Sequence, residues 1–358
     1  MRFQRAQVAA GLLSALPGAQ ALLRFSCSQL VVERLDPLVN PGVVGSPICT
    51  KSLNAFNATM DPSKLDIPGT ATCTTCQFAE DFSNYWTAVL FFRARNGTYH
   101  RVPQKGNVFF EQANGGMTGF RMIVGDPMER TAAGAAKYRQ LTYTCLQNSM
   151  TRTGETKNLP PKPCPAGIMA NIRFPTYVFP RQEAPHPLYS VGHSPALLTN
   201  HPFHTPDAGT ARTSTAPTTP ATSPTPRAAP SRAGVPAPST HPVKIPQLFY
   251  EVIWDTTKFN NQAADWPADG SQPFVWSYGD ATGYGTHGDY VFGWKGDALQ
   301  RAMDQNCQNS QCNGLKSQSL QQGNQCTVQT TVDERIDGWL DELPGGMAVT
   351  DASGKVIH

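Results

Sequence analysis

Hydrophobic and polar positions along the chain predict β-strands as its main elements. Residues 85–95 (YWTAVLFFRAR) are apolar at consecutive positions through their middle, which is typical of a central strand covered on both faces. Asn96-Gly97 follows and is the pair best suited to a tight hairpin turn, so residues 98–102 are expected to return as the partner strand. Further strands are predicted at residues 30–35, 120–124, 141–146 and 247–256.

Helix-like patterns are few, and one long segment has no pattern of either kind. The clearest helix is predicted at residues 297–304 (DALQRAMD), which has an Asp near its start. Residues 205–240 consist almost wholly of Thr, Pro, Ala, Ser, Gly and Arg and contain no aromatic residue. Such a segment buries too little apolar area to offset the entropy lost on ordering, so we expect it to be disordered.

The segments on both sides of this region are expected to form one domain. The stretch after His241 has few convincing strands of its own, so it resembles the second half of a sheet-based core. Two independent domains joined by a linker are the alternative. The expected fold is mostly β, a single β-sandwich or jelly-roll-like domain with long loops and few short helices. The predicted parts are a signal peptide at 1–21, domain parts at 22–180 and 239–344, a disordered Pro/Thr-rich insertion at 181–238 and a polar tail at 345–358.

The N-terminus and the cysteines both indicate an extracellular, secreted protein. Arg2 and Arg5 precede a short apolar stretch, and residues 19–21 (AQA) form the small-x-small pattern that signal peptidase accepts. Nine cysteines fit an oxidising compartment, where most are expected in disulfides. The Cys73-x-x-Cys76 spacing also suits redox or zinc sites, but no second pair completes a tetrahedral site.

Composition narrows the functional classes. The chain has 358 residues, with 29 Lys and Arg against 26 Asp and Glu, and a net charge of +3 is too small to indicate nucleic-acid binding. Glycine and proline account for 30 and 31 residues, which disfavours coiled coils and helical bundles. Two sequons predict N-glycosylation at Asn57 and Asn96.

The densest group of chemically capable residues lies in 287–294 (HGDYVFGW). On a strand, His287 and Asp289 would share one face and Tyr290 and Trp294 the other. An imidazole beside a carboxylate suits proton transfer or metal contact, so we predict His287 and Asp289 as catalytic residues. Aromatic side chains can stack on sugar rings, and the predicted substrate-binding residues are Trp276, Tyr284, Trp294 and His241.

A second carboxylate is not identified by the sequence. Glu251 and Asp255 are four residues apart, which is about 13 Å along a strand and too far for the carboxylate pair of a retaining glycosidase. Other carboxylates that could contribute to a site are Glu33, Asp36, Asp126, Glu129 and Asp289. The nucleophile elbow, the P-loop, the dinucleotide fingerprint and the HExxH motif are all absent from the sequence.

Several stretches together are distinctive: residues 25–27 (FSC), 36–42 (DPLVNPG), 82–88 (FSNYWTA), 115–117 (GGM), 119–122 (GFRM), 171–175 (NIRFP), 239–243 (STHPV), 266–270 (WPADG) and 283–294 (GYGTHGDYVFGW). In this order they resemble the domain-of-unknown-function family DUF1996, which consists of secreted proteins found mainly in fungi. The resemblance spans both sides of the Thr/Pro-rich segment and so favours one interrupted domain. It implies a secreted protein and no particular activity.

The chain departs from the family pattern in two places. Family members have a His-x-His-Gln segment after the position of Pro47, whereas this chain continues with residues 48–51 (ICTK). After Thr176 the family has a Cys-Trp pair, whereas this chain enters its His/Pro/Thr-rich run. Incorrect exon boundaries would produce both departures and would also explain the odd number of cysteines.

The function that we predict is carbohydrate binding or carbohydrate chemistry at the cell wall or extracellular matrix. The sequence leaves open whether the chain is an enzyme. We expect the chain to be a monomer and its partner to be a polysaccharide or cell-wall glycan. We expect no nucleic-acid binding and no membrane contact after signal cleavage. No cofactor is predicted, although a divalent metal bound at His241 and His287 is an alternative. The other alternative is a structural wall protein without a functional site, in which the aromatic residues of 266–294 would be packed inward.

Overall fold

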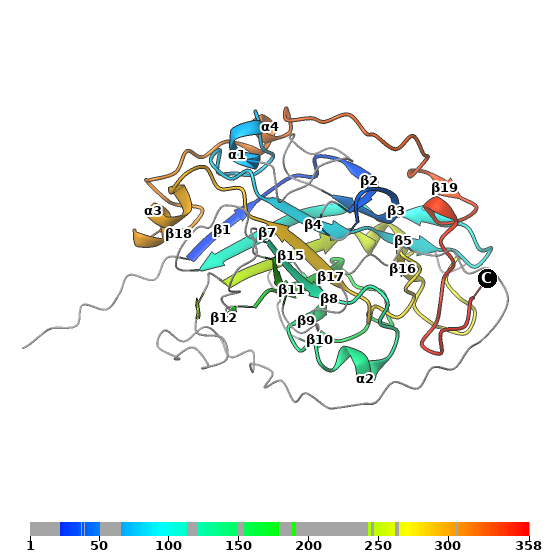
Figure 1. Ribbon diagram of the computed structural model, residues 1–358. Coiled ribbons are helices and arrows are strands. Elements are labelled where there is room, and N and C mark those ends of the chain that lie inside the picture. The colour runs from blue at the N-terminus through cyan, green and yellow to red at the C-terminus, as the bar shows by residue number, and fades with distance from the viewer. Residues whose placement is uncertain are drawn as a thin grey trace, which may run out of the picture.

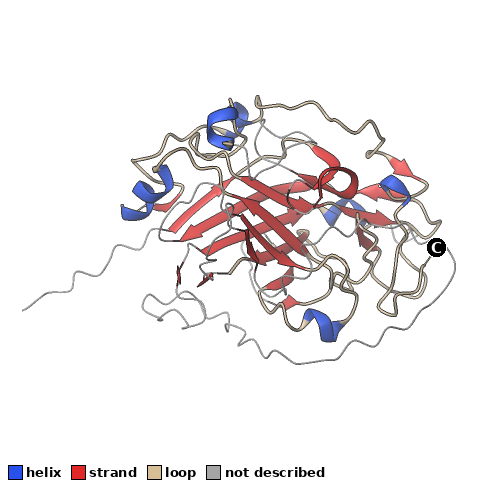
Figure 2. Ribbon diagram, viewed as in Figure 1, coloured by secondary structure: helices blue, strands red, loops and turns tan. Residues whose placement is uncertain are grey.

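The computed structural model describes residues 22–36, 38, 40–50, 66–112, 121–148, 154–175, 177–178, 188–190, 243–244, 247–261, 265–305 and 307–357. For residues 40–50, 106–112, 177–178, 188–190 and 243–244 only the backbone is described. Strands form the centre of the molecule, and short helices lie around its periphery (Figure 2). The fold is therefore mostly β, as the hydrophobic pattern predicts. Among the described residues, no helix has both the length and the apolar character needed to cross a membrane.

The largest sheet has seven strands in the order β10-β9-β11-β15-β7-β1-β18. Its strands are β1 (Leu22–Ser26), β7 (Gln104–Gln112), β9 (Leu141–Cys145), β10 (Glu155–Thr156), β11 (Ile168–Arg173), β15 (Gln247–Trp254) and β18 (Gln308–Asn309). β15 follows the Thr/Pro-rich segment in sequence, yet it pairs with β11 on one side and β7 on the other, both antiparallel. The chain on the two sides of that segment therefore shares one sheet.

The second sheet has six strands in the order β13-β8-β17-β4-β3-β2. Its strands are β2 (Val32–Asp36), β3 (Asn40–Thr50), β4 (Asn84–Ala88), β8 (Arg121–Gly125), β13 (Leu188–Ser190) and β17 (His287–Val291). Its inner face packs on the seven-stranded sheet: the Tyr85 and Tyr250 rings are 5.7 Å apart, and the Tyr250 hydroxyl donates to the Asp289 carbonyl at 3.0 Å. The two sheets form a sandwich with an aromatic core between them.

A third sheet has four strands in the order β16-β5-β6-β19, and a two-stranded ribbon pairs β12 with β14. The strands are β5 (Leu90–Arg93), β6 (Tyr99–Arg101), β12 (Tyr177–Val178), β14 (Val243–Lys244), β16 (Phe274–Trp276) and β19 (Trp339–Leu340). The predicted hairpin is confirmed: β5 pairs with β6, and Gly97 in the turn has a φ of 87°.

The strand predicted at residues 85–95 is wrong in one respect. It is two strands, β4 and β5, which belong to the six-stranded and four-stranded sheets and are separated by Val89. The Val89 carbonyl accepts from the Ser277 amide at 2.9 Å, so the chain changes its hydrogen-bonding partners at this residue. Both faces of the run are buried, as predicted, because each strand lies under other elements.

The helices are short and peripheral (Figure 1). They are α1 (Ile67–Thr70), α2 (Ala132–Ala135), α3 (Ala298–Asp304) and α4 (Leu320–Gly323), with 3₁₀ turns at Thr256–Phe259 and Pro344–Gly346. α3 confirms the helix predicted at 297–304. Its N-cap residue Asp297 makes no side-chain capping hydrogen bond and instead forms an ion pair with Arg301, four residues further along.

Four disulfides cross-link the described chain: Cys27–Cys76, Cys73–Cys326, Cys145–Cys164 and Cys307–Cys312. The expectation that most cysteines are in disulfides is therefore confirmed. Cys73 and Cys76 are each bonded to a distant cysteine, so their spacing marks neither a redox pair nor a zinc site. Cys49 lies in β3, where only the backbone is described.

Several predictions fall on residues outside the described part of the chain. These are the signal peptide at 1–21, the sequon at Asn57, almost all of the insertion at 181–238, and His241. The sequon residue Asn96 is described and is exposed in the β5–β6 turn, where its side-chain oxygen accepts from the Thr98 amide at 3.1 Å.

Candidate functional site

β17 carries His287 and Asp289 on the face of the six-stranded sheet that points away from the other sheet of the sandwich. Asp289 lies opposite Trp86 of β4, and His287 lies opposite Gly125 of β8. Residues opposite one another in adjacent strands project to the same face. Tyr290 projects to the inner face and contacts Tyr85 at 5.4 Å. We call this side of the sheet the polar face; its side chains Asn84, Trp86, Arg121, His287 and Asp289 are all buried, with His287 the most exposed at 7 %.

The His287 ring is held in one orientation. Its Nδ1 lies 2.9 Å from the Gly285 carbonyl oxygen, and the ring packs between Trp86 at 5.0 Å and Tyr278 at 4.9 Å. A carbonyl can only accept a hydrogen bond, so Nδ1 carries the proton and Nε2 keeps its lone pair. Among the described residues, no hydrogen-bond partner is recorded for Nε2. Burial lowers the pKa of His287 to about 4, so the ring is neutral at neutral pH.

The loop before β17 fixes the carbonyl that holds this ring. The fully buried carboxylate of Asp280 accepts from the Gly285 amide at 2.8 Å and from the Thr282 amide at 2.8 Å. Arg130 lies 3.7 Å from the same carboxylate and donates to the Tyr278 carbonyl at 3.3 Å. Asp280 therefore positions His287 through Gly285 without touching the ring.

Asp289 is a buried acid beside a second carboxylate. Its side chain is buried, and within the described part of the chain no group forms a hydrogen bond with Oδ2. Burial, and then the negative charge of Asp36, raise the pKa of Asp289 well above its usual range. Asp36 ends β2, and Trp86 of β4 is linked to that strand because its indole N–H donates to the Leu35 carbonyl at 3.2 Å. Both causes favour the protonated form of the Asp289 side chain over the ionised form.

His287 and Asp289 share a face as predicted, but they do not form an imidazole–carboxylate pair. They are two residues apart on one strand, which separates their Cα atoms by about 6.7 Å. The imidazole N–H is taken by the Gly285 carbonyl instead of Asp289. The carboxylate that acts on Asp289, which the sequence could not choose, is Asp36 of β2, an edge strand of the same sheet.

The aromatic residues predicted to stack on sugar lie elsewhere. Trp276 is 3 % exposed and its indole N–H donates to the Tyr143 hydroxyl at 2.9 Å, while Trp294 is 1 % exposed and packs on Phe25 at 5.9 Å. Both rings are packed in the aromatic core, and like His287 and Asp289 they are buried. Their role in stacking on sugar stays a prediction. Tyr284 is half-buried in the loop before β17.

Sequence reasoning did not single out Trp86, Tyr278 or Asp280. Trp86 lies in an apolar run and Tyr278 among eight aromatic residues, so neither stands out by pattern. Asp280 is followed by Thr282 and Gly283, a turn-forming sequence that is the available indication that this carboxylate binds backbone amides.

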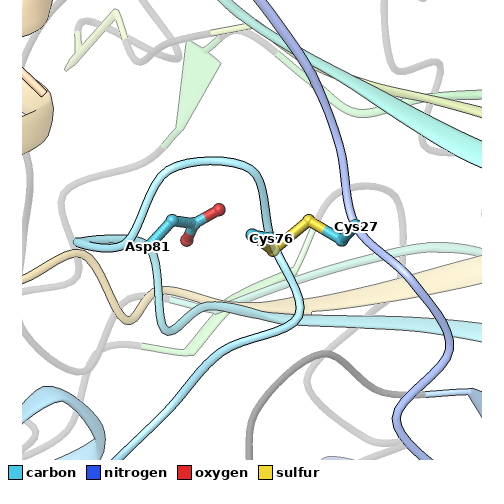
Figure 3. Close-up of side chains that lie close together, drawn as sticks. All are labelled: Cys27, Cys76 and Asp81. Carbon is cyan, nitrogen blue, oxygen red and sulfur yellow. A yellow bond between two sulfur atoms is a disulfide. The ribbon is translucent and has the colours of Figure 1, made fainter. Parts of the chain in front are cut away.

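Within the described residues, one group has the spacing of a metal site. Potential ligand atoms of Cys27, Cys76 and Asp81 all lie within 4.8 Å of one another. Figure 3 shows that the two cysteines form a disulfide and that the Asp81 side chain lies beside it. Disulfide sulfurs are not thiolates, so this group does not fit a divalent metal. Asp81 instead accepts from the Tyr85 hydroxyl at 2.7 Å and the Ser83 amide at 3.0 Å.

Comparison with known families gives one match. The model of the domain of unknown function DUF1996 matches residues 36–184 and 203–294. The chain belongs to the DUF1996 family. The DUF1996 match includes Asp36, β4, β8 and β17, so every element of the polar face lies within it, whereas residues 295–358 follow it. No curated protein and no solved structure matches the chain.

Proposed function

We propose that this DUF1996 chain is a secreted protein that binds or acts on carbohydrate of the cell wall or extracellular matrix. The four disulfides support an oxidising compartment, since such bonds are rare in the cytosol. The exposed sequon residue Asn96 also suits a secreted chain. The reaction or binding site that we propose is the polar face.

The observation that carries the proposal is the combination of one neutral base with one buried acid on a single sheet face. His287 Nε2 offers a lone pair at neutral pH, and Asp289 offers a proton beside the negative Asp36. Cleavage of a sugar chain needs a proton removed at one atom and a proton delivered to the leaving oxygen. In this proposal His287 accepts the first proton and Asp289 donates the second.

The test is an assay of the purified secreted chain on β-glucan, chitin, mannan and pectin, by reducing ends and by unsaturated products. His287→Gln keeps a neutral polar side chain without the base and should lower kcat by about 100-fold or more. Asp289→Asn should lower it similarly, whereas Asp304→Asn, at the exposed end of α3, should have no effect. Wild-type activity should fall as pH drops toward about 4, where Nε2 becomes protonated.

A structural wall protein is the second candidate, because one observation favours it. Of the eight aromatic residues between Trp266 and Trp294, six are buried, and only Trp266 and Tyr284 are partly exposed. Inward packing is what a protein without a site requires. Absence of activity and of binding on every polysaccharide, together with unchanged folding of His287→Gln by circular dichroism, would favour this candidate over the first.

A further inference from the structure

Four aromatic side chains form one row across the four-stranded sheet. Phe274 of β16 lies opposite Phe92 of β5, Phe92 opposite His100 of β6, and His100 opposite Trp339 of β19. Side chains opposite one another share a face, so all four rings project from the same side of the sheet. We call this set the aromatic row.

The aromatic row is covered at one end and open at the other. Phe259 stacks on Phe92 at 4.4 Å and meets the edge of His100 at 5.6 Å, and Trp266 meets Phe274 at 6.1 Å. Phe259 and Trp266 thus cover the row from Phe274 to His100. Trp339, on the edge strand β19, is 43 % exposed, and it is the one aromatic side chain among the exposed large hydrophobic residues of the described chain.

The indole of Trp339 is held in place on its covered side. The indole meets the His100 and Phe92 rings edge-on, with ring centroids 5.2 Å and 6.3 Å apart. The ion pair of Arg101 with Asp337, at 2.6 Å, links this segment to β6. Within the segment, the Arg335 guanidinium donates to the Trp339 carbonyl at 3.0 Å. A ring fixed in this way loses little conformational freedom when a ligand stacks on it.

His100 supplies a polar group beside this ring. Its Nδ1 lies 2.9 Å from the Arg101 carbonyl oxygen, so in the neutral ring Nδ1 donates and Nε2 is left as an acceptor. A pyranose ring has an apolar C–H face, which suits the electron-rich face of an indole, and hydroxyl groups at its rim, which suit an acceptor. A flat aromatic side chain with one adjacent acceptor therefore matches one sugar ring of an uncharged glycan.

We propose that Trp339 and His100 form a second carbohydrate-binding site, which stacks one sugar ring of an uncharged polysaccharide at the edge of the four-stranded sheet. This inference rests on the proposed function for its ligand class, but it uses different residues from the polar face. Trp339 also lies beyond residues 36–184 and 203–294 that match the DUF1996 model. It supplies the exposed aromatic surface that buried Trp276 and Trp294 do not.

The test is calorimetric titration of the full secreted chain with cellohexaose and with laminarihexaose, with an oligogalacturonate of equal length as the charged counterpart. Trp339→Ala should weaken binding of an uncharged hexamer about ten-fold or more, and Trp339→Phe should weaken it less. His100→Ala should weaken it by a smaller factor. Leu320→Ala removes another exposed apolar side chain and should leave the affinity unchanged.

Each alternative outcome is distinct. Wild-type affinity in Trp339→Ala overturns this inference, and if His287→Gln then loses binding, the proposed function at the polar face stands without it. A dimer in light scattering that Trp339→Ala dissociates also overturns it, because a second copy of the chain then occupies the ring. Failure of the wild type to bind any of the three oligosaccharides overturns the inference, and together with no activity on polymers it overturns the proposed function too.

Discussion

Buried titratable side chains make the stability of this protein depend on pH. Burial lowers the pKa of His287 to about 4, and it raises the pKa of Asp81 to about 7. These two pKa shifts change the stability of the folded chain with pH in opposite directions. Stability from His287 is present at high pH and lost as pH falls, whereas stability associated with protonated Asp81 is present at low pH and lost as pH rises.

His287→Gln should isolate the first of these effects. In the unfolded chain the pKa of His287 is 6.5, so between pH 6.5 and about 4 the unfolded state takes up the proton first. The folded wild type should therefore lose about 3 kcal/mol over this interval through His287, and the variant should not. Urea denaturation at pH 4, 5, 6 and 7 measures the difference between the two proteins, in which the contribution of Asp81 cancels. A difference that is constant over this range would contradict the burial of a neutral imidazole.

At this scale, alternation in the sequence placed His287 and Asp289 on one face but could not tell that both faces of the strand are covered. It placed Trp294 on the opposite face, and both Trp294 and Trp276 are in the core. Asp36 was one of several acidic residues in the sequence, and only the contact of Trp86 with the Leu35 carbonyl beside it on β2 selects it. Residue identity therefore indicated candidate side chains, whereas their burial and partners depended on packing between strands distant in sequence.

Among the elements, the contact of β8 with β17 depends on a glycine. Gly125 has a φ of +96°, and a Cβ at this position would lie 2.7 Å from the His287 Cα. Gly125→Ala should therefore strain the backbone and displace His287, with a loss of about 3 kcal/mol in stability and of most activity. Gly154 also has a positive φ, of +78°, but has nothing within 4 Å of a Cβ, so Gly154→Ala should cost only about 1 kcal/mol.

Thermal unfolding and polysaccharide assays of both glycine variants measure this contrast. Equal losses in the two variants would mean that backbone strain alone matters, and that the close approach of β8 to His287 does not. Full activity in Gly125→Ala would show that the reaction does not depend on where β8 and β17 hold the His287 ring.

Local patterns predicted most single elements but not their assignment to sheets. The Asn96-Gly97 turn and the strands near residues 141–146 and 247–256 follow from residue type and alternation. The change of sheet at Val89 cannot be predicted from the sequence, because the residues on both sides of Val89 are apolar and buried. One continuous strand would show the same pattern. Only the carbonyl of Val89, bonded to Ser277, reveals the change, and Ser277 lies far away in sequence.

For the whole molecule, β15 and one disulfide join parts that are far apart in sequence. Cys73–Cys326 links residues separated by 253 positions, whereas Cys307–Cys312 spans 5. In the chain-entropy treatment of disulfides, closure of the longer loop contributes about 5 kcal/mol and of the shorter about 2 kcal/mol. The Cys73→Ser/Cys326→Ser variant should therefore have a lower Tm than Cys307→Ser/Cys312→Ser. The reverse order in calorimetry would show that the long cross-link does not restrict the unfolded chain as expected.

The strand run of β4 and β5 has a consequence for the size of ligands. Trp86, which touches His287, and Phe92, which touches Trp339, are six residues apart on one continuous stretch. At about 3.3 Å per residue, their Cα atoms are at most about 20 Å apart. The connecting backbone therefore sets an upper limit on the separation of the proposed reaction and anchoring sites. In our proposal, one oligosaccharide chain of at least that length is able to contact both.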